Sequence, residues 1–316
     1  MNIIFMGTPD FAVVQLRALV DAGHNVQCVL SNPDKPRGRG GELSPPQVKR
    51  WALERGLRVQ QPATLRDGAI LPLLDECKPD VIVVAAYGKI LPQYALDYPK
   101  YGCVCVHASL LPKYRGAAPI NWALINGEAI SGVTIMRMDA GVDTGDMILQ
   151  GEVPIPRGMD AGALHDALAE TGAALLLRAL RQLEAGTAVF TKQDSCGIEP
   201  SYVTKIDNAF CELDFTRPAL ELEHRIYGLA PYPGAFTRLD GKLIKVFAAT
   251  ALDGALTDEA PGSAIPAGGG IDAACGGGGV LRLLEVQPEG GRRMSCAEFA
   301  RGKYRGPGML SGKKFG

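Results

Sequence analysis

Two patterns of apolar positions alternate along the first half of the chain. Short apolar runs at 2–6, 26–30 and 79–86 predict β-strands, and the last run is nearly unbroken, as is typical of a parallel strand buried on both faces. Between the first two runs, apolar residues recur at helical spacing until Gly23. This strand–helix–strand beginning predicts an α/β fold with a mostly parallel sheet.

The stretch from Gly102 to Asp146 contains two further strand-like runs, each followed by a polar turn. His107 ends the first run, and Asp143 lies in the turn after the second. Ligands of open α/β sheets bind beyond the carboxyl ends of the strands, so we expect His107 and Asp143 to face one crevice. Histidine can accept and return a proton near neutral pH, and a neighbouring aspartate would orient its ring. A helix is expected at 161–185.

The composition changes near Phe190. Residues 191–205 are polar and rich in turn formers, which is typical of a linker between a domain at 1–190 and another at 206–316. A helix is expected at 219–229. Short strands separated by glycine-rich turns then predict a small β-barrel, with strands at 235–239, 243–249, 262–265 and 280–286 and hairpin tips at 268–270 and 276–279.

The composition is that of a globular protein. Of the 316 residues, 47% are hydrophobic and 21% charged, and the formal net charge is −1, so a nucleic-acid partner would have to be met by local basic patches. The N-terminus does not read as a signal peptide, and no apolar run reaches the roughly 20 residues that span a bilayer. We therefore expect a cytoplasmic protein without a membrane partner, whose eight cysteines are reduced, buried thiols.

Two segments are locally basic. Residues 32–49 are dense in proline and glycine and are expected to form a long exposed loop, whose cations could grip phosphates: Lys35, Arg37, Arg39 and Lys49. The C-terminal tail is also basic, which is typical of nucleic-acid contact or simply of a solvated end, and its candidate residues are Arg292, Arg293, Arg301 and Lys303.

Several common chemistries have no motif here. The turn after the first strand lacks the GxGxxG pattern of dinucleotide binding, and no GxSxG elbow of a serine hydrolase occurs. No metal is expected, because the histidines and cysteines show no ligand spacing. Cys103 and Cys105 share one face of a strand, where two thiols are more often core than a metal pair.

The motifs around His107 resemble those of the folate-dependent formyltransferases, and most closely the methionyl-tRNA formyltransferase family. HASLLPKYRGAAP at 107–119 resembles that family's HxSLLP and RGAAP segments, and MDAGVDTGD at 138–146 resembles its MDxGxDTGD. The resemblance extends over nearly the whole chain through GTPDF at 7–11, PDKPRGRG at 33–40, AYGKILP at 86–92 and GLAPYPGAFT at 228–237.

This resemblance implies a Rossmann-like N-terminal formyltransferase domain joined to an OB-like barrel. It also implies transfer of the formyl group of 10-formyltetrahydrofolate to the α-amino group of methionine on initiator tRNA. The implied catalytic residues are His107 and Asp143, with Asp143 orienting His107 and helping to move a proton. The implied folate-binding residues are Tyr87, Gly88, Lys89, Ile90, Leu91, Ser109, Leu110, Leu111, Pro112, Asp139, Gly141 and Val142.

The basic loop resembles the family's insertion that engages the tRNA acceptor end, with Arg39 at the position of its key arginine. Gly41 and Glu42 stand where basic residues are common, which implies weaker loop affinity. We expect the tRNA to contact this loop and the basic tail, and the protein to act as a monomer.

The catalytic segment departs from the family pattern at one position. The family has Asn-x-His, whose amide helps to bind the formyl oxygen, whereas this chain has Cys105-Val106-His107. A thiol is a weak donor. Three interpretations follow: the enzyme is impaired or engineered at Cys105, water or another amide substitutes, or Cys105 carries the formyl group covalently.

Two other functions compete with transfer to tRNA. A sugar-nucleotide formyltransferase acting on a UDP-amino sugar shares the HxSLLP segment and the fold, and NWALINGE at 121–128 leans that way. A catalytically dead RNA-binding protein is the alternative from another class, because of Cys105.

Overall fold

The computed structural model describes residues 1–37, 42–268, 270–303 and 312–316, which form two compact units. The first unit contains Met1–Gly116, Ile130–Pro154 and His165–Tyr202, and the second contains Ala117–Ala129, Ile155–Leu164 and Val203–Gly316. Each unit therefore contains several segments that are separate in the sequence. The domain segments 1–190, 191–205 and 206–316 remain a prediction.

A seven-stranded sheet forms the centre of the first unit, in the order β10-β9-β7-β6-β1-β2-β5. Its strands β1, β2, β5, β6 and β7 are parallel, which confirms the expected α/β fold. β6, with the sequence VIVVA, is buried along its whole length because both faces of the sheet are covered. The strands are β1 Asn2–Gly7, β2 Asn25–Leu30, β5 Val59–Gln60, β6 Val81–Ala85, β7 Cys103–His107, β9 Ile130–Arg137 and β10 Met147–Pro154.

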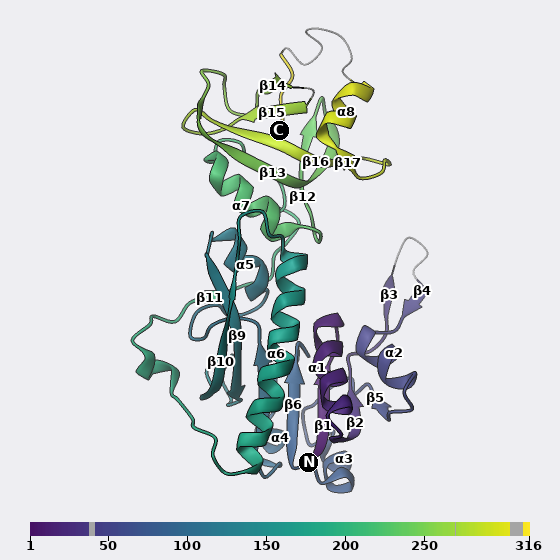
Figure 1. Cartoon of the computed structure of the whole chain (residues 1–316). Coiled ribbons are helices and arrows are strands. Elements are labelled where there is room, and N and C mark those ends of the chain that lie inside the picture. Colours follow the sequence, from purple (N-terminus) through teal and green to yellow (C-terminus); the bar gives the residue numbers. More distant parts are fainter. Residues whose placement is uncertain (38–41, 269, 304–311) are drawn as a thin grey trace. The chain divides into compact units, whose positions relative to one another are not determined.

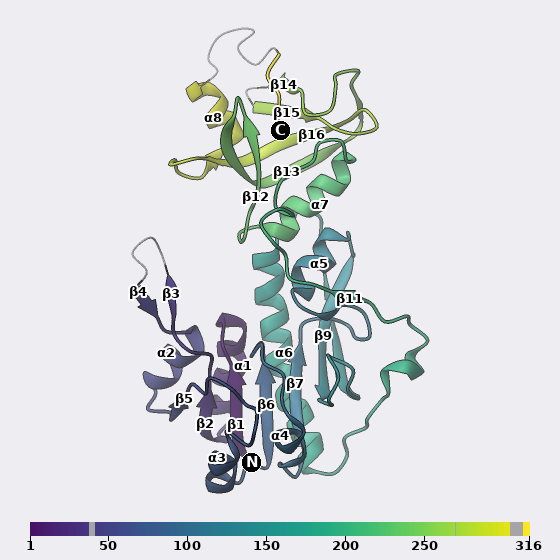
Figure 2. The same ribbon diagram turned by 180° about the vertical axis from the view of Figure 1, so that it is seen from behind.

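Helices cover both faces of this sheet. Figure 1 shows α1 (Asp10–Asp21) and α6 (Ala161–Glu184) over one face, and Figure 2 shows the strands from behind. On that second face, α3 (Leu71–Cys77) and α4 (Gln93–Asp97) pack with side chains of β1, β2, β6 and β7 in one buried cluster. The expected helix at 161–185 is confirmed as α6, and four leucines of its apolar stripe are fully buried: Leu164, Leu168, Leu176 and Leu180.

The direction of β9 differs from expectation. We expected β7 and β9 to end at the same edge of the sheet. β9 runs antiparallel to β7, with Val104 opposite Arg137 and His107 opposite Thr134. It therefore ends where β7 begins, and the backbone N–H of Met138 donates to the carbonyl of Cys103. The turn that carries Asp143 can reach His107 only by running back along the sheet.

The described parts of the basic segment contain strands and a helix where a long exposed loop was expected at 32–49. It forms an antiparallel hairpin of β3 (Lys35–Arg37) and β4 (Glu42–Ser44), followed by α2 (Gln47–Leu53). Lys49 donates to both carboxylate oxygens of Asp34 and to Gln61 at the base of this hairpin. Arg39 lies outside the described residues.

The expected linker also has structure. It contains a 3-10 helix, η1 (Gln193–Cys196), and a short strand, β11 (Tyr202–Val203), which pairs with β8 (Arg115–Gly116). The N–H of Arg115 donates to the carbonyl of Ser201. Polar composition indicated a solvated connection, but long-range pairing holds this segment against the first unit.

An antiparallel β domain forms the second unit, with the sheet order β12-β13-β16-β15-β14 and β17 paired to β16. Isolated bridges join Phe315 to Leu239 and Lys314 to Ser263, so the C-terminal residues connect β12 to the segment before β14. The sequence-based prediction did not include β15, which lies between the two expected hairpin tips. The strands are β12 Ala235–Leu239, β13 Lys242–Leu256, β14 Ala264–Ala267, β15 Gly270–Ala274, β16 Gly279–Pro288 and β17 Met294–Ser295.

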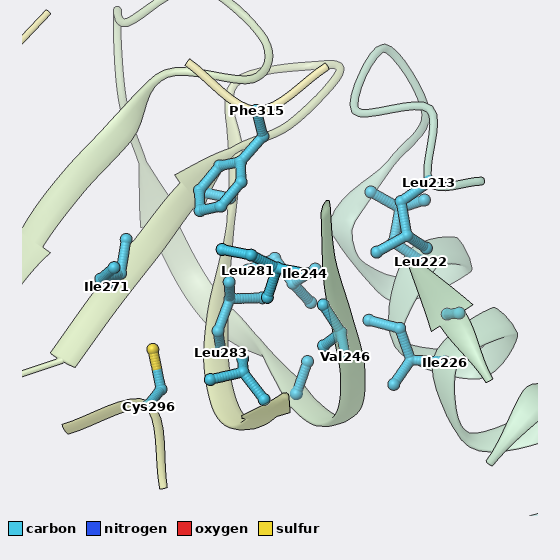
Figure 3. Close-up of a cluster of buried hydrophobic side chains, with 14 of the residues drawn as sticks. Leu213, Leu222, Ile226, Ile244, Val246, Ile271, Leu281, Leu283, Cys296 and Phe315 are labelled. Carbon is cyan, nitrogen blue, oxygen red and sulfur yellow. The ribbon is translucent and has the colours of Figure 1, made fainter. Parts of the chain in front are cut away.

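The core of this unit lies between the sheet and α7 (Ala219–Leu229), the helix expected at 219–229 (Figure 3). Leu222 and Ile226 of α7 point toward Ile244 and Val246 of β13, and Phe315 covers the other end of the cluster. The described part of the unit also contains α5 (Pro119–Ile125) and α8 (Cys296–Lys303).

All eight cysteines are free, as expected, and all except Cys196 are buried. In the described parts of the chain, none of the helices has the length and apolar character needed to cross a membrane.

Candidate active site

His107 ends β7 at the carboxyl edge of the parallel strands, and its side chain is almost fully buried. Nε2 of the ring lies 3.0 Å from the carbonyl oxygen of Tyr114. Nδ1 lies 3.6 Å from Oδ1 of Asp143. The structure thus brings together the histidine and the carboxylate that the sequence indicated.

Both neighbours of the imidazole are hydrogen-bond acceptors. A carbonyl oxygen only accepts, so Nε2 of His107 must carry a proton to bond Tyr114. If the ring is neutral, the lone pair on Nδ1 then faces the Asp143 carboxylate, whereas the imidazolium directs an N–H toward it. This pocket is therefore suited to a ring that holds a positive charge during a reaction.

Asp143 lies at the tip of the loop that follows β9. Its backbone is left-handed, with φ of 54°, and its Oδ2 accepts a hydrogen bond from the N–H of Gly116 at 2.8 Å. At the start of the loop, Asp139 accepts from the N–H of Gly141 and from Thr144 Oγ1. A non-glycine residue keeps such a backbone conformation only when its surroundings determine it.

Cys105 lies two residues before His107 on the same face of β7 and is buried in a cluster with Leu111, Met136 and Met147. Burial raises the pKa of the Cys105 thiol far above its ordinary value, and the Asp143 charge raises it further. Burial likewise raises the pKa of Cys103 to about 12. Cys105 is therefore a neutral thiol at physiological pH, and the thiolate required of a covalent formyl carrier is not available.

The Ser-Leu-Leu-Pro turn after His107 is held by residues that the sequence did not indicate. Thr134 of β9, fully buried, donates to the carbonyl of Ser109 and accepts from the N–H of Leu111. Gln150 of β10 donates to Thr134 and to the carbonyl of Leu111. Thr134 is a polar residue among the buried positions of β9, which is a signal that could have revealed it, whereas Gln150 lies at an exposed position of β10.

The loop after β6 begins at the same sheet edge as His107. Tyr87 is 1% exposed and Leu91 is buried, both in the core beneath α3 and α4. Desolvation raises the pKa of Tyr87 to about 12. Lys89 donates to the carbonyls of Pro62 and Ala63, and burial lowers its pKa. Ile90 is 79% exposed, so within this loop it is the apolar side chain that faces outward.

Arg115 and Gln193 form a buried polar pair beside the site. Arg115, 5% exposed, donates through Nε and Nη2 to Oε1 of Gln193 and through Nη1 to the hydroxyl of Tyr202. Gln193 donates to the carbonyls of Asp143 and Gly145. In the sequence, Arg115 stands out only as a member of the RGAAP segment. The sequence of the polar segment 191–205 does not distinguish Gln193 from its polar neighbours, so its role was not predicted.

A cavity of about 680 Å³ lies beside Asp139 and Ala140. Its lining includes Leu96, Arg137, Asp139, Ala140 and Phe190, and the Arg137 guanidinium lies over the Phe190 ring. His107 and Asp143 do not line it. Of the residues proposed from the sequence to bind folate, Asp139 contributes to this cavity.

Two of the expected basic residues of the tail, Arg292 and Arg293, are engaged within the second unit. Arg292 pairs with Glu298, and Arg293 pairs with Glu285 and lies over the Phe247 ring. Arg301 and Lys303 lie on α8. Lys35 and Arg37 lie on β3.

A parallel sheet with a histidine–aspartate pair at its carboxyl edge, followed by a separate antiparallel β unit, defines the class. The formyl transferase family model matches residues 1–180, and the model of the formyl transferase C-terminal domain matches residues 205–304. The chain belongs to the formyl transferase family.

Within that family, similar curated proteins share one name. The methionyl-tRNA formyltransferase of Agathobacter rectalis is 46% identical over 96% of both chains. That of Lachnospira eligens is 44% identical over 99% of this chain and all of its own. That of Caldanaerobacter subterraneus is 45% identical over 95% of this chain and 96% of its own.

Solved structures share the fold at low identity. The sugar 3N-formyl transferase WlaRD, determined with dTDP and 5-N-formyl-THF, gives a TM-score of 0.67 at 18% identity, over 90% of this chain and 97% of its own. HypX from Aquifex aeolicus with tetrahydrofolic acid gives 0.61 at 17% identity, over 99% of this chain and 48% of its own.

Proposed function

We propose that this chain transfers the formyl group of 10-formyltetrahydrofolate to the α-amino group of methionyl initiator tRNA. The observation that carries the proposal is full-length identity of 42–46% to proteins named methionyl-tRNA formyltransferase. The contact between His107 and Asp143 supports the chemistry, because it supplies a proton-transfer group beside an anion. The solved sugar formyltransferases share the fold with this chain at only 18% identity.

In the proposed reaction, the neutral amine of the methionyl group attacks the formyl carbon, and a new C–N bond forms as the bond to the folate nitrogen breaks. His107 as imidazolium stabilises the oxyanion through its positive charge, while its two ring N–H groups face the carbonyl of Tyr114 and the carboxylate of Asp143. Asp143 orients the ring and, through a water molecule, accepts the proton from the attacking amine. That proton then passes to the departing folate nitrogen.

The folate is proposed to bind between the loop at 87–91, the turn at 109–112 and the loop that carries Asp139, Gly141 and Val142. Two exposed apolar side chains, Ile90 and Val142, support this assignment because they lie on loops that flank the site. Three residues of these loops are buried: Tyr87, Leu91 and Leu111. We propose that they act indirectly, by fixing the backbone that contacts the folate.

The tRNA is proposed to contact the β3–β4 hairpin through Lys35, Arg37 and Arg39. Lys49 would join only by exchanging Asp34 for a phosphate. On the second unit the proposed contacts are Arg292, Arg293, Arg301 and Lys303. The exposure of Arg292, 70% for its side chain, supports a phosphate contact there.

The proposed role of Cys105 is that of a poor substitute for an amide donor. Its buried, neutral thiol argues against a covalent formyl intermediate. The enzyme should therefore act by direct attack of the amine but more slowly than a chain with a full donor at this position.

Purified chain incubated with 10-formyltetrahydrofolate and either Met-tRNA or a UDP-amino sugar tests the proposal. We expect formyl-Met-tRNA and no formylated sugar, with His107→Ala losing most of the rate. Formylation of the sugar alone would establish a sugar-nucleotide formyltransferase instead. RNA binding without any formyl transfer would leave only a binding protein.

A further inference from the structure

We propose that Gln193 is a positioning residue that sets the separation between Asp143 and His107. This inference rests on the proposed function. Gln193 lies on η1, inside the segment that composition marks as a linker, and is 2% exposed.

All four hydrogen-bonding positions of the Gln193 amide are used. Its Nε2 donates at 2.8 Å to the carbonyls of both Asp143 and Gly145. Its Oε1 accepts from Nε and Nη2 of Arg115 at 2.9 and 2.8 Å. Arginine only donates and carbonyls only accept, so the amide can take just one orientation. A buried amide of this kind joins two segments rigidly.

The segment at the other end of this connection touches both members of the pair. The carbonyl of Tyr114 contacts Nε2 of His107, and the N–H of Gly116 donates to Oδ2 of Asp143. Residues 114–116 therefore form a template between the imidazole and the carboxylate. Gln193 fastens Arg115, the middle residue of that template, to the backbone of Asp143.

Gln193 supports segments whose backbone conformation is unfavourable. Asp143 has φ of 54° and Tyr114 has φ of 61°, and both conformations are disfavoured for residues with a Cβ. Arg115 forms no ion pair with a carboxylate among the described residues, so the neutral Gln193 and Tyr202 receive its donors. Without Gln193, the loop would relax and the distance of 3.6 Å between Nδ1 and Oδ1 would increase.

Two substitutions separate the two halves of the amide. Gln193→Glu still accepts from Arg115, now as a charged partner, but presents oxygen instead of N–H to the carbonyls of the loop. Gln193→Met removes both interactions. Gln15→Met is the matched control, because Gln15 is also fully buried and also donates to two backbone carbonyls, those of Phe11 and Ala169.

The experiment measures kcat and KM for Met-tRNA and for 10-formyltetrahydrofolate, together with hydrogen–deuterium exchange of peptides covering 139–147. We expect Gln193→Glu and Gln193→Met to lower kcat by about 10- to 100-fold, with either KM changed less than about threefold and faster exchange in the loop. Gln15→Met should lower stability comparably to Gln193→Met and leave both readouts unchanged.

Three results would overturn the inference: normal kcat in Gln193→Glu, a loss in Gln193→Met no larger than in Gln15→Met, or unchanged exchange at 139–147. If the wild-type chain does not formylate Met-tRNA, the proposed function fails. The exchange comparison still decides whether Gln193 holds the loop.

Discussion

Oδ1 of Asp143 lies 3.6 Å from Nδ1 of His107, although the strands that precede these two residues end at opposite edges of the sheet. The loop after β9 closes this gap by running back beside β7. The relationship depends on a left-handed backbone at Asp143 and on the N–H of Gly116, which fixes the other carboxylate oxygen. Substitutions that change the charge or the loop should therefore affect the reaction more than the fold.

Asp143→Asn is expected to lower kcat for Met-tRNA formylation by about 10²-fold, the usual size of a proton-transfer contribution. The asparagine oxygen can still accept from Gly116, so the loop should keep its shape. Steady-state kinetics provide the measurement. Asp146→Asn is the control, because Asp146 lies on the same loop and pairs with Arg137 at the exposed surface. Equal rates for Asp143→Asn and the wild type would remove Asp143 from the mechanism.

Cys105→Asn is expected to raise kcat, on the order of 10-fold or more, because an amide donor can stabilise the developing oxyanion. The same change should lower the free energy of unfolding by about 1–3 kcal/mol, since a polar group enters an apolar cluster. Cys105→Ala, which supplies no donor, should not raise kcat. Turnover of Cys105→Asn at or below the wild-type rate would show that the missing amide does not limit catalysis.

Gly145→Ala is expected to lower kcat by at least about 10-fold through displacement of the Asp143 loop. A Cβ at this position would lie 1.9 Å from the backbone carbonyl oxygen of Arg137, which cannot yield as a side chain would. Gly270→Ala is the control, because there the nearest atom is 3.6 Å away and φ is not positive. A crystal structure of Gly145→Ala with an unmoved Asp143 would contradict the explanation.

Glu223→Gln is expected to change how stability depends on pH. Burial alone would raise the pKa of Glu223, but hydrogen bonds from Arg157 and from the N–H of Ala251 outweigh it, so the pKa is lowered. A carboxyl with a depressed folded pKa stabilises the protein above its unfolded pKa of about 4.3, and this contribution is lost as pH falls through the folded value.

The wild type should therefore exceed Glu223→Gln in unfolding free energy by about 1–2 kcal/mol at pH 7, and the difference should shrink toward pH 3. Urea unfolding at several pH values measures this. Glu259→Gln, at an exposed position of the same unit, is the control and should differ from the wild type by less than about 0.5 kcal/mol. A pH-independent difference would assign the effect of Glu223 to packing.

The sequence alone predicted the elements whose stability depends on local pattern. The apolar run at 79–86 became β6, helical spacing placed α6 and α7, and His107 was recognised at the end of its strand. These features follow from the period of apolar positions, because the period decides which face of a strand or helix is buried.

Only the tertiary structure decided the direction of β9, the return of Asp143 to His107, the pairing of β3 with β4 and the contact of Gln193 with Arg115. Alternation with a period of two is the same for a parallel and an antiparallel strand, so it cannot tell at which edge the strand ends. A single amide in a polar segment likewise carries no periodic signal. Its partner is 78 residues away, and only folding brings the two together.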